Sequence, residues 1–398
     1  INSFPIGNST ALSAWHRTAV ELVMDLSKLW GRNRQSVSTS PEQLYRAVLL
    51  ANDLVAKILS IRESELDNVE VDCTLTKDPR HGVKRRKFQS SRKLTTELLV
   101  QTVALGFSRC DPKIAVDAAH KAQKLLYRLE EINIKYQEII QVHNLSFNEF
   151  DICLNTKVYN HVLSCWSRSL SNDSEKQAIG LLQRMKTPRN DVISFPRPDI
   201  ISYNNILNLY ATRGDVDSAE AMLNHLEESE NGITADVYSY STVMKTIQRR
   251  FLSKQGGDRS IKDPKRAEEL LARLVRKYEE SGFTDARLCP TAVTFGTVLS
   301  LYAAADRLMK ENLQMNQSRS WLTRNAERSS QLIISDAEYL GWGAENAERV
   351  LEWIIGISER ERRSRDKAGS TETNHHTVSS DSNHDNFIRP SVQHLVTA

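Results

Sequence analysis

The chain contains few glycines and prolines, with 15 and 10 among 398 residues. These residues are frequent in the turns of turn-rich and all-β folds, so such a fold is not expected. Its five cysteines are scattered, and no two lie at the spacing of a metal-binding knuckle. That usage fits a reducing compartment better than a disulfide framework. No apolar run reaches the roughly 18 residues that a membrane span requires. We therefore expect neither a disulfide scaffold nor a membrane partner.

Signatures of catalysis are missing as well. The sequence contains no His-Glu-x-x-His motif, no Walker phosphate loop and no Gly-x-Gly-x-x-Gly loop. No cluster of histidine and cysteine resembles the zinc site of a deaminase. We therefore predict that the chain is not an enzyme, and we expect no catalytic residue, no metal site and no cofactor. The alternative is a helical enzyme whose site lies outside this chain.

Charge and chain ends say little about partners. The formal net charge of +3 permits an anionic partner but does not demand one. Hydrophobic residues make up 40% of the chain, as in an ordinary folded protein. Because the chain begins with isoleucine, we expect a processed form or a fragment whose targeting peptide is not visible.

A spacing of small and large apolar residues recurs along the chain. Six times an alanine is followed by large apolar residues at +3, +4 and +7, and we call it the stripe alanine. This spacing is the inner face of an amphipathic helix with one position small enough for close helix approach. The six stripe alanines are Ala51, Ala122, Ala178, Ala219, Ala267 and Ala347. Six copies of one template predict a repeat protein.

Each striped helix, which we call helix B, has an upstream partner, helix A. Five of the six partners end in an aromatic residue, which we interpret as a core side chain between the helices. The aromatic residues are Trp15, Phe107, Trp166, Tyr210 and Tyr302. In the clearest turn, Gly214 and Asp215 have the residue types of a helix end and a helix N-cap. The predicted fold is an all-α, right-handed solenoid of helix-turn-helix repeats.

The spacing between the helices varies and suggests four regions. Residues 1–92 are predicted to be a divergent repeat with a long basic, polar insertion over residues 62–92. Residues 93–360 form the array of helical hairpins. Residues 361–388 lack a core period and are expected to be a disordered tail or insertion. Residues 389–398 are expected to begin a further, truncated repeat. The basic run at residues 84–87 resembles a nuclear localisation signal or a phosphate patch, although we favour a solvated loop.

Three of the A helices begin with similar sequence motifs. They are Asn-Thr-Lys-Val-Tyr-Asn at 155–160, Asp-Ile-Ile-Ser-Tyr-Asn at 199–204 and Asp-Val-Tyr-Ser-Tyr-Ser at 236–241. Together with Gly-Asp-Val-Asp-Ser-Ala-Glu at 214–220 in the following helix B, these motifs resemble the repeat of the pentatricopeptide repeat family. Tyr203 and Tyr240 are 37 residues apart, and the other units are longer, similar to expanded repeats of unicellular algae. The competing tetratricopeptide wording, Trp-x2-Leu-Gly-x2-Tyr, is absent.

The resemblance implies single-stranded RNA as the partner. In that family a side chain in the first turn of helix A reads one base together with the last residue of the same repeat. Carried over by position, the pairs are Asn160 with Asp199, Asn204 with Asp236, Gln101 with Asn155, and Ser241 with Thr291. The first two are combinations that the resemblance associates with pyrimidines, uracil most of all. The third is unusual, and the fourth departs from the family pattern.

A second set of residues lies two positions before the signature aromatic residue of helix A. Lys157, Ile201, Tyr238 and Val293 would stack on bases or wedge beside them. The structural alternative is that the paired residues only begin and cap helices. By resemblance, we expect a monomer that acts in organellar RNA stability, processing, editing or translation, in the mitochondrion or alternatively in the plastid. Protein partners are compatible with this reading, and a protein–protein interaction scaffold of the tetratricopeptide type is the alternative function.

Overall fold

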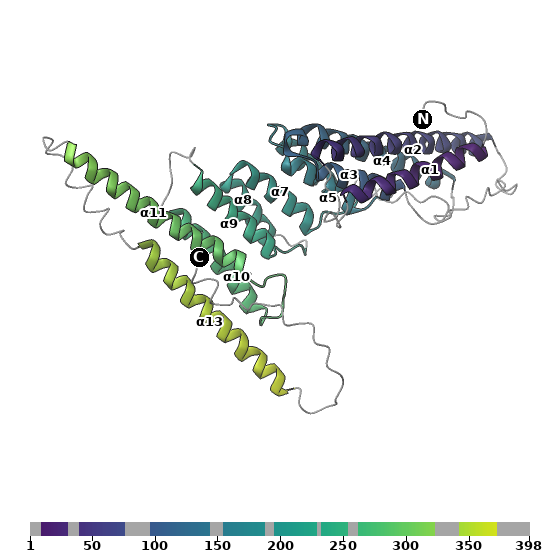
Figure 1. Ribbon diagram of the computed structural model, residues 1–398. Helices are drawn as coiled ribbons and strands as arrows, with labels where there is room; N and C mark the ends of the chain where they lie inside the picture. Colours follow the sequence, from purple (N-terminus) through teal and green to yellow (C-terminus); the bar gives the residue numbers. More distant parts are fainter. Residues whose placement is uncertain are drawn as a thin grey trace. The chain divides into compact units, whose positions relative to one another are not determined.

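The computed structural model describes residues 9–30, 40–75, 96–143, 154–187, 195–228, 232–253, 262–322 and 342–371 (Figure 1). Within these ranges all regular structure is helical. The chain divides into two compact units, Ile1–Thr212 and Arg213–Ala398, and each is described by itself. The prediction of an all-α fold of helical hairpins is confirmed.

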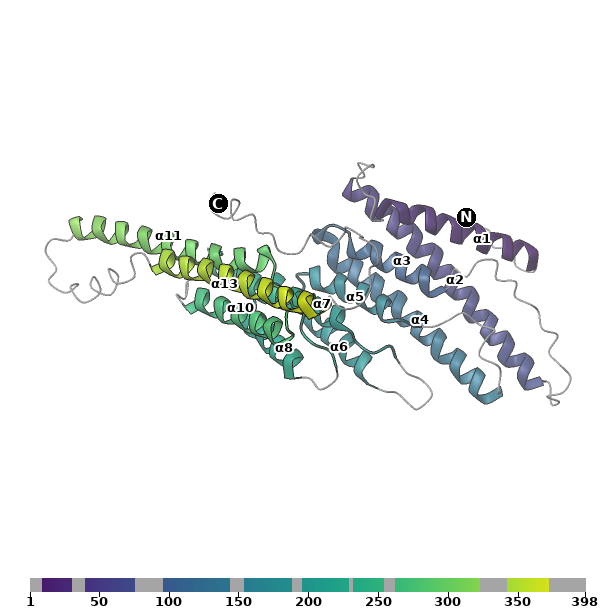
Figure 2. The same cartoon turned by 90° about the horizontal axis from the view of Figure 1, so that it is seen from below.

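The first unit pairs helices as the hairpin template requires. Its elements are α1 (Ser9–Ser27), η1 (Lys28–Trp30), α2 (Pro41–Leu75), α3 (Thr96–Ser108), η3 (Pro112–Ile114), α4 (Ala115–His143), α5 (Thr156–Arg168), α6 (Ser174–Lys186) and α7 (Ile200–Arg213). Arg213, the last residue of α7, belongs to the second unit. The A helices α1, α3 and α5 contact one another in that order, and the B helices α2 and α4 lie side by side (Figure 2). Stacked hairpins therefore share two rows of helices.

The second unit repeats this arrangement with longer helices at its end. It contains α8 (Val216–Glu228), α9 (Val237–Leu252), α10 (Lys262–Glu280), α11 (Ala292–Leu322) and α13 (Trp342–Thr371). Helix α9 contacts α8, α10 and α11, and α11 contacts α10 and α13. Consecutive A helices again touch, with the B helices packed against them.

The predicted stripes form the inner face of every B helix. Ala51, Ala122, Ala178, Ala219 and Ala267 are all at most 1% exposed, so a neighbouring helix passes close to each of them. In α13 the stripe is less covered, because Ala347 is only half-buried although Val350 is fully buried. A small residue at each of these positions lets helices approach where a larger one would hold them apart.

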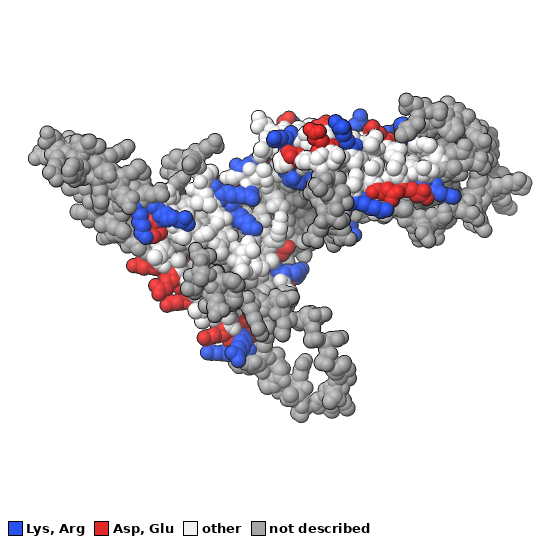
Figure 3. Space-filling view, in the orientation of Figure 1, with Lys and Arg blue, Asp and Glu red and all other residues white. Residues whose placement is uncertain are grey.

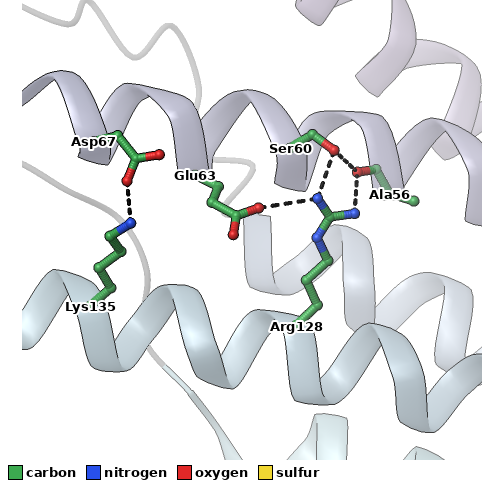
Figure 4. Close-up of polar contacts among 6 residues, drawn as sticks. All are labelled: Ala56, Ser60, Glu63, Asp67, Arg128 and Lys135. Carbon is green, nitrogen blue, oxygen red and sulfur yellow. Dashed lines mark hydrogen bonds and ion pairs between the residues drawn. The ribbon is translucent and has the colours of Figure 1, made fainter.

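Helix α2 extends into the segment that we expected to be a polar insertion. It runs to Leu75, well past residue 62, and its polar contacts with α4 extend as far as Asp67 (Figure 4). The guanidinium of Arg128 donates to the Ala56 carbonyl at 3.1 Å and to Ser60 Oγ at 2.7 Å, and it lies 3.2 Å from Glu63. Lys135 pairs with an acidic residue of α2 one turn further on. The basic run at residues 84–87 lies outside the described residues.

Helix α13 likewise continues past residue 360, into the expected disordered segment. The reason is Glu361, which is 6% exposed and accepts a hydrogen bond of 3.0 Å from the Tyr278 hydroxyl of α10. A buried acceptor that meets its donor extends the packed face by another turn. The expectation of disorder is therefore wrong for residues 361–371. Residues 372–398, including the expected start of a truncated repeat, lie outside the described residues.

Close approaches and turns explain two glycines. A Cβ atom on Gly106 of α3 would lie 2.9 Å from Val48 Cγ2 and 3.0 Å from Trp30 Cε2, so only glycine fits without a shift. Gly214 has a φ of 73°, in the region that favours glycine. Asp215 then accepts from the Ser218 amide at 3.1 Å and caps α8. The turn that the sequence predicted at Gly214 and Asp215 is confirmed.

A buried polar cluster joins the second and third hairpins. Glu130 of α4 is fully buried, accepts from the Tyr159 hydroxyl of α5 at 2.5 Å and lies 2.5 Å from the Arg184 guanidinium of α6. Burial and the Glu130 carboxylate raise the pKa of Tyr159 far above its usual value, so this hydroxyl remains a donor. Arg184 also stacks over the rings of Tyr127 and Phe195.

We define a junction pair as the residue eight positions after a stripe alanine together with the residue at the signature aromatic position of the next helix A. The second unit repeats the Glu–Tyr pair with Glu227 and Tyr240, again joined by an arginine from the following helix B. The ammonium of Lys186 instead lies 5.0 Å from the Tyr203 ring centroid. Two junction pairs are apolar and buried, namely Leu59 with Val100 and Val275 with Phe295. A junction pair that contains a tyrosine thus has a charged second residue, and a pair without a tyrosine has two apolar residues.

Candidate nucleic-acid interface

The strongest candidate site lies where α5 and α7 meet, at the predicted pair of Asn160 and Asp199. Asn160 projects from the second turn of α5, and Asp199 directly precedes α7. The Asn160 amide nitrogen donates to Asp199 Oδ1 at 3.0 Å. The structure thus brings together two residues that are far apart in the sequence. Their expected pairing is present in the described structure.

Asp199 also caps α7, so the structural and the functional interpretations of this residue both apply. Its Oδ1 accepts from the Ser202 backbone amide at 2.9 Å, as an N-cap does. The Asp199 amide in turn donates to Ser202 Oγ at 3.2 Å, which closes a reciprocal capping arrangement. One carboxylate oxygen therefore serves both the helix end and the neighbouring amide. The cap fixes the position of the carboxylate before any ligand arrives.

Ser202 joins the cluster as a residue that we did not select from the sequence. Its hydroxyl lies 2.6 Å from Asn160 Oδ1 and 3.0 Å from Asp199 Oδ1. A sequence signal did exist, because Asp-x-x-Ser occurs at 199–202 and again at 236–239. Asn205 adds a further bond from its side-chain nitrogen to the Asn160 backbone carbonyl at 3.0 Å. Asn160 is 6% exposed and held from several sides.

The second predicted pair, Asn204 with Asp236, is divided between the two units. Asn204 belongs to the first unit, where it is 7% exposed, and Asp236 belongs to the second. Their pairing therefore stays a prediction. Asp236 does repeat the capping geometry, because it accepts from the Ser239 amide and the Ser239 hydroxyl, both at 2.8 Å. The same Asp–Ser unit thus begins both α7 and α9.

The remaining predicted pairs are not joined by hydrogen bonds among the described residues. Asn155 caps α5 by accepting from the Val158 amide at 3.1 Å, and no bond links it to Gln101 of α3. Ser241 donates to the Val237 carbonyl of its own helix at 2.6 Å rather than towards Thr291. For these residues the described contacts are those of helix ends and helix interiors.

The predicted stacking residues form an exposed set at one position of successive A helices. Ile201, Tyr238 and Val293 are 56%, 50% and 52% exposed, although their neighbours in the first turn are mostly buried. Lys157 is exposed at the same position of α5. Each of these side chains is therefore available for contact within its own unit. Their exposure is what base stacking would need, but stacking itself stays a prediction.

Charge near the candidate site is mixed. Burial, together with the charges of Arg109 and Lys157, lowers the pKa of His161 to about 4. Burial raises the pKa of Glu97 to about 7, and Lys157 opposes that rise. On the face shown in Figure 3, basic and acidic side chains lie close together over each unit. Binding by a large single-signed surface is therefore not indicated by this face.

The described residues contain no group of three or more histidine, cysteine, aspartate or glutamate side chains placed to hold a metal ion. The described cysteines, Cys110, Cys165 and Cys289, are buried thiols. Burial raises the pKa of Cys110 to about 11, which leaves little thiolate at neutral pH. Among the described helices, none is long and apolar enough to cross a membrane.

Residues 198–247 match a model of the PPR repeat family, a segment that spans α7, α8 and most of α9. The matched segment thus belongs to the family that the sequence resemblance predicted for this chain. No curated protein matches it. A crystal structure of the pentatricopeptide repeat protein PPR10 from maize is similar at 15% identity with a TM-score of 0.31, covering 88% of this chain and 49% of that one. The chain thus spans about half the length of that structure.

Proposed function

We propose that this chain binds single-stranded RNA, with one base read where each A helix meets the next. The observation that carries the proposal is the Asn160–Asp199 hydrogen bond of 3.0 Å between two hairpins. An amide can complement the Watson–Crick edge of an unpaired base, and a fixed carboxylate sets the direction of that amide. The family match over residues 198–247 supports the proposal, because the resemblance to this family implies RNA as the partner.

Stacking supplies the second half of the proposed contact. Ile201 and Tyr238 stand about half-exposed in the first turns of successive A helices. Stacking of a base on an aromatic side chain such as Tyr238 contributes about 1–3 kcal/mol per base in single-strand binders, and the branched Ile201 would pack beside a base. The amides would then select among bases that the apolar side chains hold. With only two predicted Asn–Asp pairs in this chain, its intrinsic sequence preference is modest and favours uridine.

The cellular role is proposed on the sequence resemblance alone. By that resemblance, the protein acts in RNA stability, processing, editing or translation within the mitochondrion, or alternatively the plastid. Occupying a transcript, and so masking or exposing part of it, is the mechanism. The chain is proposed to act as a monomer and without catalysis of its own. Crosslinking followed by RNA sequencing would identify the transcript, and imaging of a tagged full-length protein would identify the compartment.

Filter binding with poly(U) and poly(A) at low salt tests the proposal. We expect tighter binding of poly(U), and the double variant Asn160→Ala/Asn204→Ala should weaken it by at least about tenfold, with unchanged helicity. Asn224→Ala on α8 is a matched control, because Asn224 is an exposed asparagine of a B helix and should leave binding unaltered. Absence of binding to both polymers would refute the proposal and leave the interaction scaffold. Equal affinity of the double variant and the wild type would refute the assigned pairs.

A further inference from the structure

The Ser202 hydroxyl determines which of two orientations the Asn160 side-chain amide adopts, with either its nitrogen or its oxygen facing Asp199. Ser202 Oγ accepts from the Asp199 backbone amide at 3.2 Å, so its single hydrogen is free to be donated. The nearer acceptor is Asn160 Oδ1 at 2.6 Å, against 3.0 Å for Asp199 Oδ1. The hydroxyl therefore donates to the amide oxygen, while Asp199 accepts from the amide nitrogen. Each end of the amide meets a partner of opposite hydrogen-bonding type.

Rotating the amide by half a turn would break both contacts. Asn160 Oδ1 would then face the Asp199 carboxylate, which has no hydrogen to offer, and two acceptors would lie at hydrogen-bond distance. Because Asn160 is 6% exposed, water cannot readily compensate for that loss. Asp199 disfavours the rotated amide by repulsion, and Ser202 favours the observed one by donation. In the observed orientation one N–H of Nδ2 and one lone pair of Oδ1 remain for a ligand.

The orientation of an amide distinguishes uracil from cytosine. Uracil offers a carbonyl acceptor at O4 beside a donor at N3, whereas cytosine offers an amino donor at N4 beside an acceptor at N3. An asparagine that meets uracil with its N–H at O4 must rotate to satisfy cytosine. A side chain that prevents rotation therefore favours one pyrimidine over the other without touching the base.

We propose that Ser202 is a positioning residue that holds the Asn160 amide in the orientation that pairs with uracil and mismatches cytosine. The proposal rests on the proposed RNA binding and deepens it. The equivalent serine at the start of α9, Ser239, makes the same contacts to Asp236, so the capping part of the arrangement recurs in the chain. The equivalent residue of α5 is Val158, so the start of α5 lacks this hydroxyl.

The test compares two variants of equal shape, Ser202→Thr and Ser202→Val, in the full chain. Valine occurs naturally at this position as Val158 of α5, so the helix start accommodates it. Affinities for oligo(U) and oligo(C) are measured by fluorescence anisotropy, with helicity checked by circular dichroism. We expect Ser202→Thr to keep the ratio of the two affinities and Ser202→Val to lower it by about three- to tenfold, as the loss of one hydrogen bond implies.

Ser218→Val is the matched control, because Ser218 occupies the same place after a capping aspartate on a B helix, α8. It should leave the oligo(U)-to-oligo(C) ratio unchanged. If the wild type binds neither oligonucleotide, the proposed function fails. If the wild type prefers oligo(U) and Ser202→Val keeps that preference, RNA binding stands and the positioning role of Ser202 is refuted. A ratio lowered equally by the threonine variant would also refute it, because shape rather than the hydroxyl would then matter.

Discussion

Replacing the buried Glu130–Tyr159 pair by apolar residues should test whether the hairpins are joined by matched side chains. Tyr159→Phe removes one hydrogen bond to a fully buried carboxylate, and such bonds contribute about 2 kcal/mol. Glu130→Leu leaves the buried hydroxyl and the Arg184 guanidinium without their acceptor, and breaking a buried pair in this way costs about 4 kcal/mol.

The double variant separates this mechanism from simple loss of packing. With both changes made, a phenyl ring faces a leucine, much as Phe295 and Val275 already form an apolar junction pair. Only Arg184 then lacks its partner, and its side chain is 33% exposed, so water can reach it. We expect a total cost of about 3 kcal/mol, against about 6 kcal/mol if the two changes were independent, which is a coupling energy of about 3 kcal/mol.

Equilibrium unfolding in urea, followed by far-ultraviolet circular dichroism on the full chain, measures these free energies. Tyr45→Phe is the matched control, since its hydroxyl bonds to the exposed Asp117 and its loss should change the free energy of unfolding by less than about 0.5 kcal/mol. Single costs that simply add, or a Tyr159→Phe cost as small as that of the control, would contradict the reasoning.

Three further outcomes follow from the helix packing and from His161. Gly106→Ala should destabilise the protein by about 1–3 kcal/mol through the close contacts of its new Cβ, whereas Gly180→Ala should stabilise it by about 0.5–1 kcal/mol because nothing lies within 4 Å. Ala219→Trp should cost about 3 kcal/mol or more, since Ala219 is fully buried between helices. The lowered pKa of His161 means that the unfolded state binds the proton first. Between pH 6.5 and about 4, wild type should therefore lose stability relative to His161→Gln as the pH falls.

Thermal and urea unfolding of the same variants decide each of these outcomes. Similar stability of Gly106→Ala and Gly180→Ala would mean that the α3 contact is not close. An unchanged unfolding transition in Ala219→Trp would mean that the helix–helix contact is misplaced. If the difference in the free energy of unfolding between wild type and His161→Gln does not change across that pH range, the pKa of His161 is not lowered by folding.

The repeated stripe was enough to predict the hairpins, because a helix face with one small residue leaves few ways to pack. The pairing of Asn160 with Asp199 was predicted through the family resemblance, which pairs the residue after the signature tyrosine with the last residue of the same repeat. Ser202 could have been found from the Asp-x-x-Ser spacing, which marks a capped helix start. The extension of α2 and α13 was not predictable, because it depends on partners such as Arg128 and Tyr278 in other helices.

The pairs that the structure does not join show the limit of positional transfer. Gln101 and Asn155 occupy the expected positions, yet Asn155 is used by the Val158 amide for capping. Ser241 satisfies its hydroxyl within its own helix. Short polar side chains near a helix start find local backbone partners, and sequence spacing alone does not reveal which partner is chosen.

The junction pairs have a consequence for how such a chain can change over time. A hairpin moved to another place in the chain would carry its Glu130 to face a phenylalanine, or its Lys186 to face a valine. The first mismatch would leave the buried Glu130 carboxylate without its hydroxyl partner, and the second would remove the contact between the Lys186 ammonium and a tyrosine ring. Duplication or exchange of single hairpins is therefore restricted, although each hairpin folds on the same template. The order in which bases could be read along a strand is preserved by residues that would never contact the strand.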